Sequence, residues 1–315
     1  MYFSEEKALI EVKNLSKSYG SIPAVKDISF TVKEGYIYGF LGPNGAGKST
    51  TMNMICGCLA TTSGEINVNG YDLTDDPIDA KSCIGYLPEI PPLYTDMTPF
   101  EYLEFVGLAK GLRKEELYDD IEYVMEKTGI EDVADRLIRK LSKGYKQRVG
   151  IAQAILGDPD IIILDEPTVG LDPIQIIEIR NLIKELGEEH TVILSSHILQ
   201  EIEAVCDRVI MISQGRIVAD DTLEALTRDE TLEEAFIRLA GESLDSGAAY
   251  AMEKACEKEE KSSKKGKKKI IGESDLGAAY YTEIYVDEDP EEEDDEDEDY
   301  ESESDIEDCK EEDCE

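Results

Sequence analysis

Residues 36–41, with the sequence YIYGFL, run directly into residues 42–50, with the sequence GPNGAGKST, and this stretch decides the fold class of the 315-residue chain. A short, mostly apolar run bounded by turn residues is typical of a buried strand. The glycine-rich segment has the form G-x-x-x-x-G-K-[ST], after which we expect a helix to start near Gly47. A strand, a glycine-rich turn and a helix in this order indicate an α/β fold.

The rest of the chain repeats strands and helices around this segment. Residues 161–164 (IIIL) form a continuous apolar run, as expected of a central parallel strand, and residues 191–194 and 209–212 have the same character. Upstream, residues 8–12 and 28–32 read as short antiparallel strands. Residues 65–68 and 84–87 read as a second strand pair, punctuated by Asn69-Gly70.

Between residues 94 and 141 the apolar residues change to helical spacing, for example Tyr102, Phe105, Val106 and Ala109. We therefore expect a helical insertion at about residues 90–150. The complete prediction is an α/β P-loop NTPase core with a mainly parallel sheet, an N-terminal antiparallel β subdomain and an inserted α-helical subdomain.

The glycine-rich loop predicts a phosphate site. Its backbone N–H groups form an anion nest at a helix N-terminus, where Lys48 reaches the β- and γ-phosphates and the Ser49 hydroxyl holds Mg²⁺. The expected nucleotide-binding residues of the loop are Gly42, Pro43, Asn44, Gly45, Ala46, Gly47, Lys48, Ser49 and Thr50.

A second acidic motif, Leu164-Asp165-Glu166-Pro167, ends the apolar run at residues 161–164. Acidic residues at the carboxyl end of a buried parallel strand emerge where such sheets bind ligands. We expect Asp165 to orient Mg²⁺ and Glu166 to act as the general base that polarises the attacking water. The alternative is that these carboxylates cap the following helix.

Residues 141–148, with the sequence LSKGYKQR, resemble the LSGGQ signature of the ATP-binding cassette (ABC) ATPases. The resemblance covers about residues 8–240 and six ordered motifs. It implies that Tyr19 stacks on adenine, that Gly170-Leu171-Asp172 is the D-loop and that His197 contacts the γ-phosphate. The alternative for Tyr19 is an aromatic side chain that fills the core, and we expect the second histidine, His190, to lie on the surface.

The family resemblance also implies a dimer. Ser142 and Gly144 open a helix whose N-terminus suits a γ-phosphate. Within one chain they cannot easily reach Lys48, so in the family each signature closes the site of a second subunit in a two-fold dimer. The expected partners are therefore a second copy and a separate transmembrane permease, which would enter a cleft near Glu89 and Tyr94.

Two positions depart from the common family pattern. Glu89 stands where many relatives carry a glutamine that senses Mg²⁺ and the membrane partner, and Lys143 replaces a small residue of the signature. With Pro91-Pro92-Leu93-Tyr94 and the ending at residues 232–236, these features are similar to ATPases of bacterial gliding-motility, multidrug and antibiotic-resistance exporters. Two alternatives stay open: a non-transport ABC ATPase acting on ribosomes or nucleic acid, and a regulatory module that no longer hydrolyses ATP.

Composition limits the function classes. The formal net charge of −40 repels phosphate backbones, so we expect no nucleic-acid partner. None of the seven cysteines has CxxC spacing, which favours a reduced cytosolic compartment. The N-terminus lacks the pattern of a signal peptide, and no run of about 18 apolar residues occurs. We therefore expect a peripheral protein at the cytoplasmic face of the cell membrane.

The C-terminal part of the chain carries much of this charge. Residues 287–315 contain 21 acidic residues and one lysine, half of the net charge, and residues 261–269 are rich in lysine. Blocks of like charge repel themselves and have little apolar surface to bury. We therefore divide the chain into an ATP-binding domain at residues 1–242 and a disordered tail at residues 243–315, in which residues 278–286 are a candidate for a short binding element.

Overall fold

The computed structural model describes residues 7–242. The expectations for the tail, residues 243–315, lie outside the described residues. Along the chain the elements are β1 (Ala8–Tyr19), β2 (Ile22–Lys33), β3 (Ile37–Leu41), α1 (Lys48–Ile55), β4 (Ser63–Val68), β5 (Tyr71–Asp72), α2 (Pro77–Ser82), β6 (Ile84–Leu87), α3 (Pro99–Ala109), α4 (Lys114–Thr128), η1 (Glu131–Val133), η2 (Ile138–Lys140), α5 (Lys143–Ile155), β7 (Ile161–Asp165), α6 (Pro173–Leu186), β8 (Thr191–Ser196), α7 (Leu199–Val205), β9 (Arg208–Ser213), β10 (Arg216–Thr222), α8 (Leu223–Leu226) and α9 (Leu232–Glu242).

The strands form two sheets. The smaller sheet has the order β2-β1-β4-β5, and all of its pairings are antiparallel. The larger sheet has the order β10-β9-β3-β8-β7-β6 and is parallel except for the edge pair β9–β10. The N-terminal antiparallel subdomain and the mainly parallel core are both confirmed.

Two of the expected strand assignments need correction. β4 and β6 are not a pair, because β4 pairs with β1 and β5 while β6 pairs with β7 in the other sheet. The reason is burial: Gly85 of β6 lies so close to the Ala154 backbone of α5 that a side chain would not fit there. β1 and β2 are also longer than expected, at 12 residues each, because the pairing continues through polar residues to the tight turn at Gly20.

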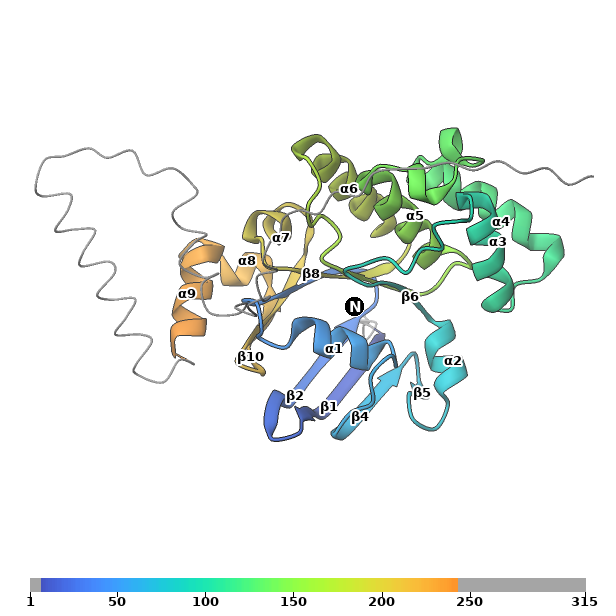
Figure 1. The fold of residues 1–315 in the computed structure, drawn as a ribbon. Coiled ribbons are helices and arrows are strands. Elements are labelled where there is room, and N and C mark those ends of the chain that lie inside the picture. Colours follow the sequence, from blue (N-terminus) through green and yellow to red (C-terminus); the bar gives the residue numbers. More distant parts are fainter. Residues whose placement is uncertain (1–6, 243–315) are drawn as a thin grey trace, which may run out of the picture. The chain divides into compact units, whose positions relative to one another are not determined.

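Helix α1 lies between the two sheets, and the longer helices cover the opposite face of the larger sheet (Figure 1). The burial pattern of β7 shows why both faces are apolar. Ile161 and Ile163 belong to the core shared with α1 and the smaller sheet, whereas Ile162 and Leu164 belong to the core formed with α3 to α7. The continuous apolar run in the sequence is therefore explained by burial on both faces.

The helical insertion consists of α3, α4, the short helices η1 and η2, and the start of α5. Its first helix has a capping box, in which the Thr98 side chain accepts from the Glu101 amide and the Glu101 carboxylate accepts from the Thr98 amide. α4 ends at Gly129, whose φ of 63° is the left-handed conformation that glycine adopts easily. Within residues 7–242 no helix is long and apolar enough to cross a membrane.

Candidate nucleotide site

The glycine-rich loop connects the end of β3 to the start of α1. Gly45 and Gly47 have φ values of 77° and 108°, which side-chain-bearing residues rarely adopt. A Cβ atom at Gly47 would lie 2.9 Å from the Ala24 carbonyl oxygen, and one at Gly42 would overlap the Ile212 carbonyl oxygen. Gly42 and Gly47 are needed because the loop packs directly against neighbouring backbone, whereas Gly45 is needed because of its positive φ.

Lys48 is the first residue of α1, and its side chain is only 6% exposed. Its ammonium group donates to the Gly42 carbonyl at 2.8 Å and lies 3.6 Å from Glu166 Oε1. Pro43, Asn44 and Gly45 are exposed at the tip of the loop. The loop therefore has an accessible backbone rim and a buried cation at its base, a combination suited to a polyphosphate.

The carboxyl ends of β7 and β8 place Asp165 beside the phosphate loop. β7 and β8 are paired so that Asp165 stands opposite Ser195. The Asp165 carboxylate accepts from the Ser195 hydroxyl, and its Oδ1 lies 3.4 Å from Ser49 Oγ. Ser49 and Asp165 thus place two hard oxygen donors side by side across 116 residues of sequence.

The Ser49–Asp165 pair fits Mg²⁺, which prefers oxygen ligands and usually takes one or two protein ligands together with phosphate and water. Within residues 7–242 no group of three or more His, Cys, Asp and Glu side chains is arranged to hold a metal. A site made of one carboxylate, one hydroxyl and the phosphates of a nucleotide is therefore the arrangement that these residues support.

Glu166 is held in a constrained backbone conformation. Its φ is 50°, unusual for a residue with a side chain, and its amide donates to the Ser195 carbonyl at 3.2 Å and to Ser195 Oγ at 3.1 Å. The next helix starts only at Pro173, where Asp172 is the N-cap. The alternative that Asp165 and Glu166 cap a helix is therefore wrong.

His197 contacts the Glu166 side chain. The His197 Nδ1 and Glu166 Oε2 atoms are 2.8 Å apart. The hydrogen bond to Glu166 raises the pKa of His197, against the opposing effect of partial burial. Glu166 is therefore the common partner of Lys48 and His197, and the structure brings together all three residues that the sequence identified as catalytic candidates.

The signature residues lie at the N-terminus of α5. Ser142 is the exposed N-cap and accepts from the Tyr145 amide at 3.3 Å, while Gly144 is buried against the side chain of Gln175 in α6. In the part of the chain that the structure describes, no hydrogen bond or ion pair joins Ser142 or Gly144 to Lys48. A single chain therefore does not unite the signature with the phosphate loop.

Tyr19 and Glu89 are both exposed, Tyr19 at the end of a strand and Glu89 on a pocket. The Tyr19 ring is 52% exposed at the end of β1, with Lys17 Nζ 5.5 Å from its centroid, so the core-filling alternative is wrong. Glu89 is exposed on a pocket of about 310 Å³ that Lys143, Lys146 and Gln147 also line. No hydrogen bond or ion pair of the described residues joins Glu89 to Ser49 or Asp165.

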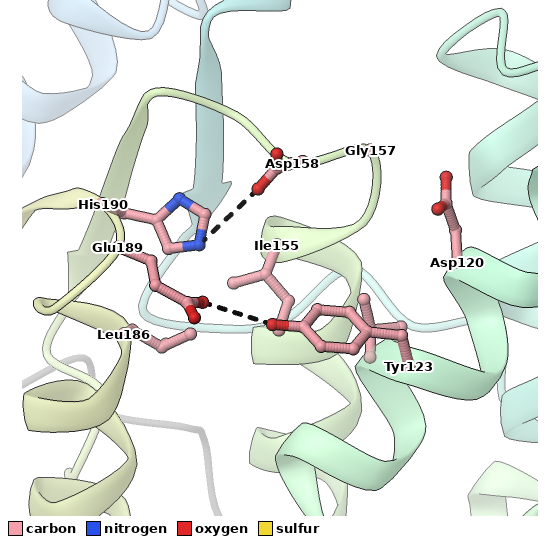
Figure 2. A pocket seen from close by; sticks show the side chains of 9 residues that line it. Asp120, Tyr123, Ile155, Gly157, Asp158, Leu186, Glu189 and His190 are labelled. Carbon is pink, nitrogen blue, oxygen red and sulfur yellow. Dashed lines mark hydrogen bonds and ion pairs between the residues drawn. The ribbon is translucent and has the colours of Figure 1, made fainter.

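The expectation that His190 lies on the surface is wrong. Its side chain is buried, with a relative exposure of 8%, and Nδ1 donates to the Pro159 carbonyl at 2.9 Å. Figure 2 shows its ring at the edge of a pocket of about 490 Å³, where Nε2 lies 3.9 Å from Asp158 and Tyr123 donates to Glu189. His190 directly precedes β8 and hydrogen bonds to the loop before β7, and this contact accompanies its burial.

Sequence reasoning missed three polar residues around the site. Ser195 holds Asp165 and the Glu166 amide, and the buried pair Thr168 and Glu201 lies just behind them. The signal for Ser195 was its place at the end of an apolar strand, at the same sheet edge as Asp165. Glu201 stands in a short helix of mixed polar and apolar residues without a distinguishing pattern.

Comparisons with known proteins identify the family of the chain. Residues 25–169 match the family model described as ABC transporter. The bacitracin transport ATP-binding protein of Bacillus licheniformis is 40% identical over 222 residues, which cover 70% of this chain and 72% of that protein. The linearmycin resistance ATP-binding protein of Bacillus subtilis (strain 168) is 40% identical over 68% of this chain and 69% of its own length.

The chain belongs to the ATP-binding proteins of ABC transporters. This confirms the family resemblance and the α/β ABC ATPase fold, and the enzyme class of the family is ATPase. A solved ATP-binding subunit of an ABC transporter has a TM-score of 0.67 and 34% identity, covering 73% of this chain and 99% of that one. A dimeric ATP-binding cassette bound to ADP and Pi has a TM-score of 0.62 and 28% identity, covering 68% and 99%.

Proposed function

We propose that this ABC ATPase works as a homodimer on the cytoplasmic face of the cell membrane, where it hydrolyses ATP with Mg²⁺ to drive export through a separate permease. The single observation that carries the proposal is the contact of Glu166 with both Lys48 and His197, beside the Ser49–Asp165 pair. A cation, a base and a histidine at the open end of a phosphate loop are the parts that phosphoryl transfer to water needs.

The contacts of Glu166 define its proposed role. In the reaction, a water oxygen attacks the γ-phosphorus, the bond to the bridging oxygen breaks and ADP leaves with that electron pair. Glu166 accepts the proton of the water, and His197, 2.8 Å away, fixes the direction of the carboxylate. Lys48 neutralises charge on the phosphates, so phosphate oxygens compete with Glu166 for its ammonium group.

Mg²⁺ held by Ser49 and Asp165 would neutralise charge on the β- and γ-phosphates. Ser195 supports this arrangement, because its hydroxyl donates to Asp165 while it also accepts from the Glu166 amide. Ser195 therefore orients both Asp165, the proposed metal ligand, and Glu166, the proposed base. Tyr19, with an exposed ring face, is the proposed adenine platform.

The exposed Ser142 at the start of α5 supports a dimer. Its helix N-terminus carries no acidic residue in the first turn, so the partial positive charge there is free to face an anion. Because one chain does not bring this end to its own Lys48, a two-fold partner is the simplest way to close the site. The related ATP-binding cassette that was solved with ADP and Pi is a dimer.

The pocket that contains Glu89 is the proposed docking place for the permease. Its apolar wall includes Ile90, which is 82% exposed, together with Leu93 and Ile138. The exporter direction is supported by relatives named for bacitracin transport and linearmycin resistance. If the proposal holds, a membrane protein co-purifies with the chain; ribosomal RNA in its place would favour a non-transport ATPase.

Glu166→Gln tests the proposed chemistry. The variant keeps the shape of the side chain but removes the base, so we expect ATP binding to be retained and kcat to fall by about 10²-fold or more. The control is Glu203→Gln, which changes an exposed glutamate of α7 and should hydrolyse ATP like the wild type. Wild-type turnover in Glu166→Gln would contradict the assignment of the base.

A further inference from the structure

Glu201 is a buried carboxylate that the proposed chemistry does not use. It lies in the first turn of α7 and is only 1% exposed. Its Oε1 accepts from the Thr168 hydroxyl at 2.5 Å and its Oε2 accepts from the Ser196 hydroxyl at 2.9 Å. Arg180 of α6 lies 3.9 Å from Oε1. Burying a carboxylate is costly, so both oxygens need such partners.

The two hydroxyl groups belong to the turns that carry the catalytic pair. Thr168 lies in the turn closed by the Val169 amide, which donates to the Glu166 carbonyl at 3.2 Å. Ser196 precedes His197, and its Oγ also accepts from the Ile198 amide at 3.0 Å, so it shapes the backbone on both sides of the histidine. Each oxygen of Glu201 thus holds one of the two turns.

We propose that Glu201 is a positioning residue that locks the Glu166 turn to the His197 turn, with Thr168 and Ser196 as its two contacts. Glu166 has a strained backbone with a positive φ, and the side chain of His197 is 40% exposed, so the contact between the two residues needs support from neighbouring groups. Ser195 already holds the Glu166 amide; Glu201 contacts both turns and thereby supports the 2.8 Å contact between Glu166 and His197.

The contact between Glu201 and Thr168 also connects to the D-loop. Thr168 lies two residues before Gly170, and the Leu171 amide donates to the Thr168 carbonyl at 3.2 Å. Gly170 in turn lies directly against the Lys143 side chain at the start of α5. Movement of the signature helix would therefore be transmitted through the D-loop to Thr168, and through Glu201 to His197. This inference rests on the proposed hydrolysis, which supplies the activity that the lock controls.

Two substitutions at Thr168 separate positioning from packing. Thr168→Val keeps the side-chain volume but removes the hydroxyl, whereas Thr168→Ser keeps the hydroxyl but leaves a small cavity. We expect kcat of Thr168→Val to fall by about tenfold or more, with KM for ATP within about twofold of the wild type. Thr168→Ser should keep near wild-type kcat even where its Tm is lower.

The rates are measured at saturating ATP and Mg²⁺, with the full chain above the concentration at which the rate per wild-type chain becomes constant. The double variant Thr168→Val/Glu201→Gln gives a second readout. If Thr168 acts through Glu201, kcat of the double variant falls no further than that of the more impaired single variant.

Three results would overturn the proposed positioning role of Glu201. These are a wild-type kcat in Thr168→Val, an equal loss of kcat in Thr168→Ser and Thr168→Val, or fully additive losses of kcat in the double variant. In each case the wild type still hydrolyses ATP, so the proposed function stands. A wild type without ATPase activity under the same conditions would overturn the proposed function and this inference together.

Discussion

Glu166 organises the site at the scale of single residues. It is buried, it lies at the end of β7 and its two carboxylate oxygens face Lys48 and His197. A buried carboxylate between a lysine and a histidine is stabilised by both, and it holds both in position before the reaction. Pre-organisation of this kind is how a phosphoryl-transfer site supplies most of its rate enhancement.

The pKa of His197 is the first quantity that reports this arrangement. Its hydrogen bond to Glu166 raises the pKa, so Glu166→Gln should lower it, because the charged partner is lost while partial burial remains. The chain has only two histidines, so NMR titration resolves them, and His197→Gln assigns the signal. An unchanged His197 pKa in Glu166→Gln would contradict the contact.

The same contact makes stability depend on pH. Since the folded-state pKa of His197 is raised above its ordinary value of about 6.5, the stabilisation is complete below that pH and is lost as the pH rises through the folded-state pKa. The difference in unfolding free energy between the wild type and His197→Gln should therefore be larger at pH 6 than at pH 9. Urea unfolding at the two pH values measures it.

At the scale of elements, the start of α3 shows how local sequence stabilises the helical insertion. Thr98→Ala removes the capping box and should cost about 1 kcal/mol. For a domain of this size we expect a Tm decrease of about 2–4 °C, measured by calorimetry. Thr98→Ser keeps the hydroxyl that accepts from the Glu101 amide and serves as the control, and an equal decrease in both variants would mean that packing, not capping, is lost.

Elements with strong local patterns could be predicted from the sequence. The P-loop, the buried strand β7 and the insertion each combine a periodic or apolar run with distinctive turn residues. The partners of β4 and of β6 could not be predicted, because the sheet to which a short strand belongs is decided by tertiary packing, here by the packing of α5 against Gly85 of β6. His190 was misplaced for the same reason, since burial of a single residue before a strand leaves no periodic signal.

In the candidate site, sequence reasoning identified the residues proposed to bind the nucleotide and the metal or to activate water, and missed the residues that hold them in position. Lys48, Asp165 and Glu166 stand in motifs whose chemistry requires those residue types at that spacing. Thr168 and Glu201 are 33 residues apart and meet only through the fold. A positioning contact of this kind has no local pattern, so the structure was needed to find it.

At the scale of the whole molecule, the site residues and the acidic C-terminal residues lie in different parts of the chain. All the proposed catalytic and nucleotide-binding residues lie between Tyr19 and His197. We therefore expect a chain that ends at residue 242 to keep its ATPase rate within about twofold of the full chain, because no group of the site is removed. A steady-state ATPase assay checks this, and a large loss would show that residues 243–315 regulate the site.

The proposed mechanism depends on a nucleotide shared between two copies of the chain. The most direct test is the mass in solution of Glu166→Gln, which should bind ATP without consuming it, measured by light scattering after size exclusion with Mg²⁺. With ATP we expect twice the 35.1 kDa mass of one chain, and with the added substitution Ser142→Arg we expect the mass of a single chain that still binds ATP. A variant that binds ATP yet keeps the mass of one chain at every protein concentration would contradict it.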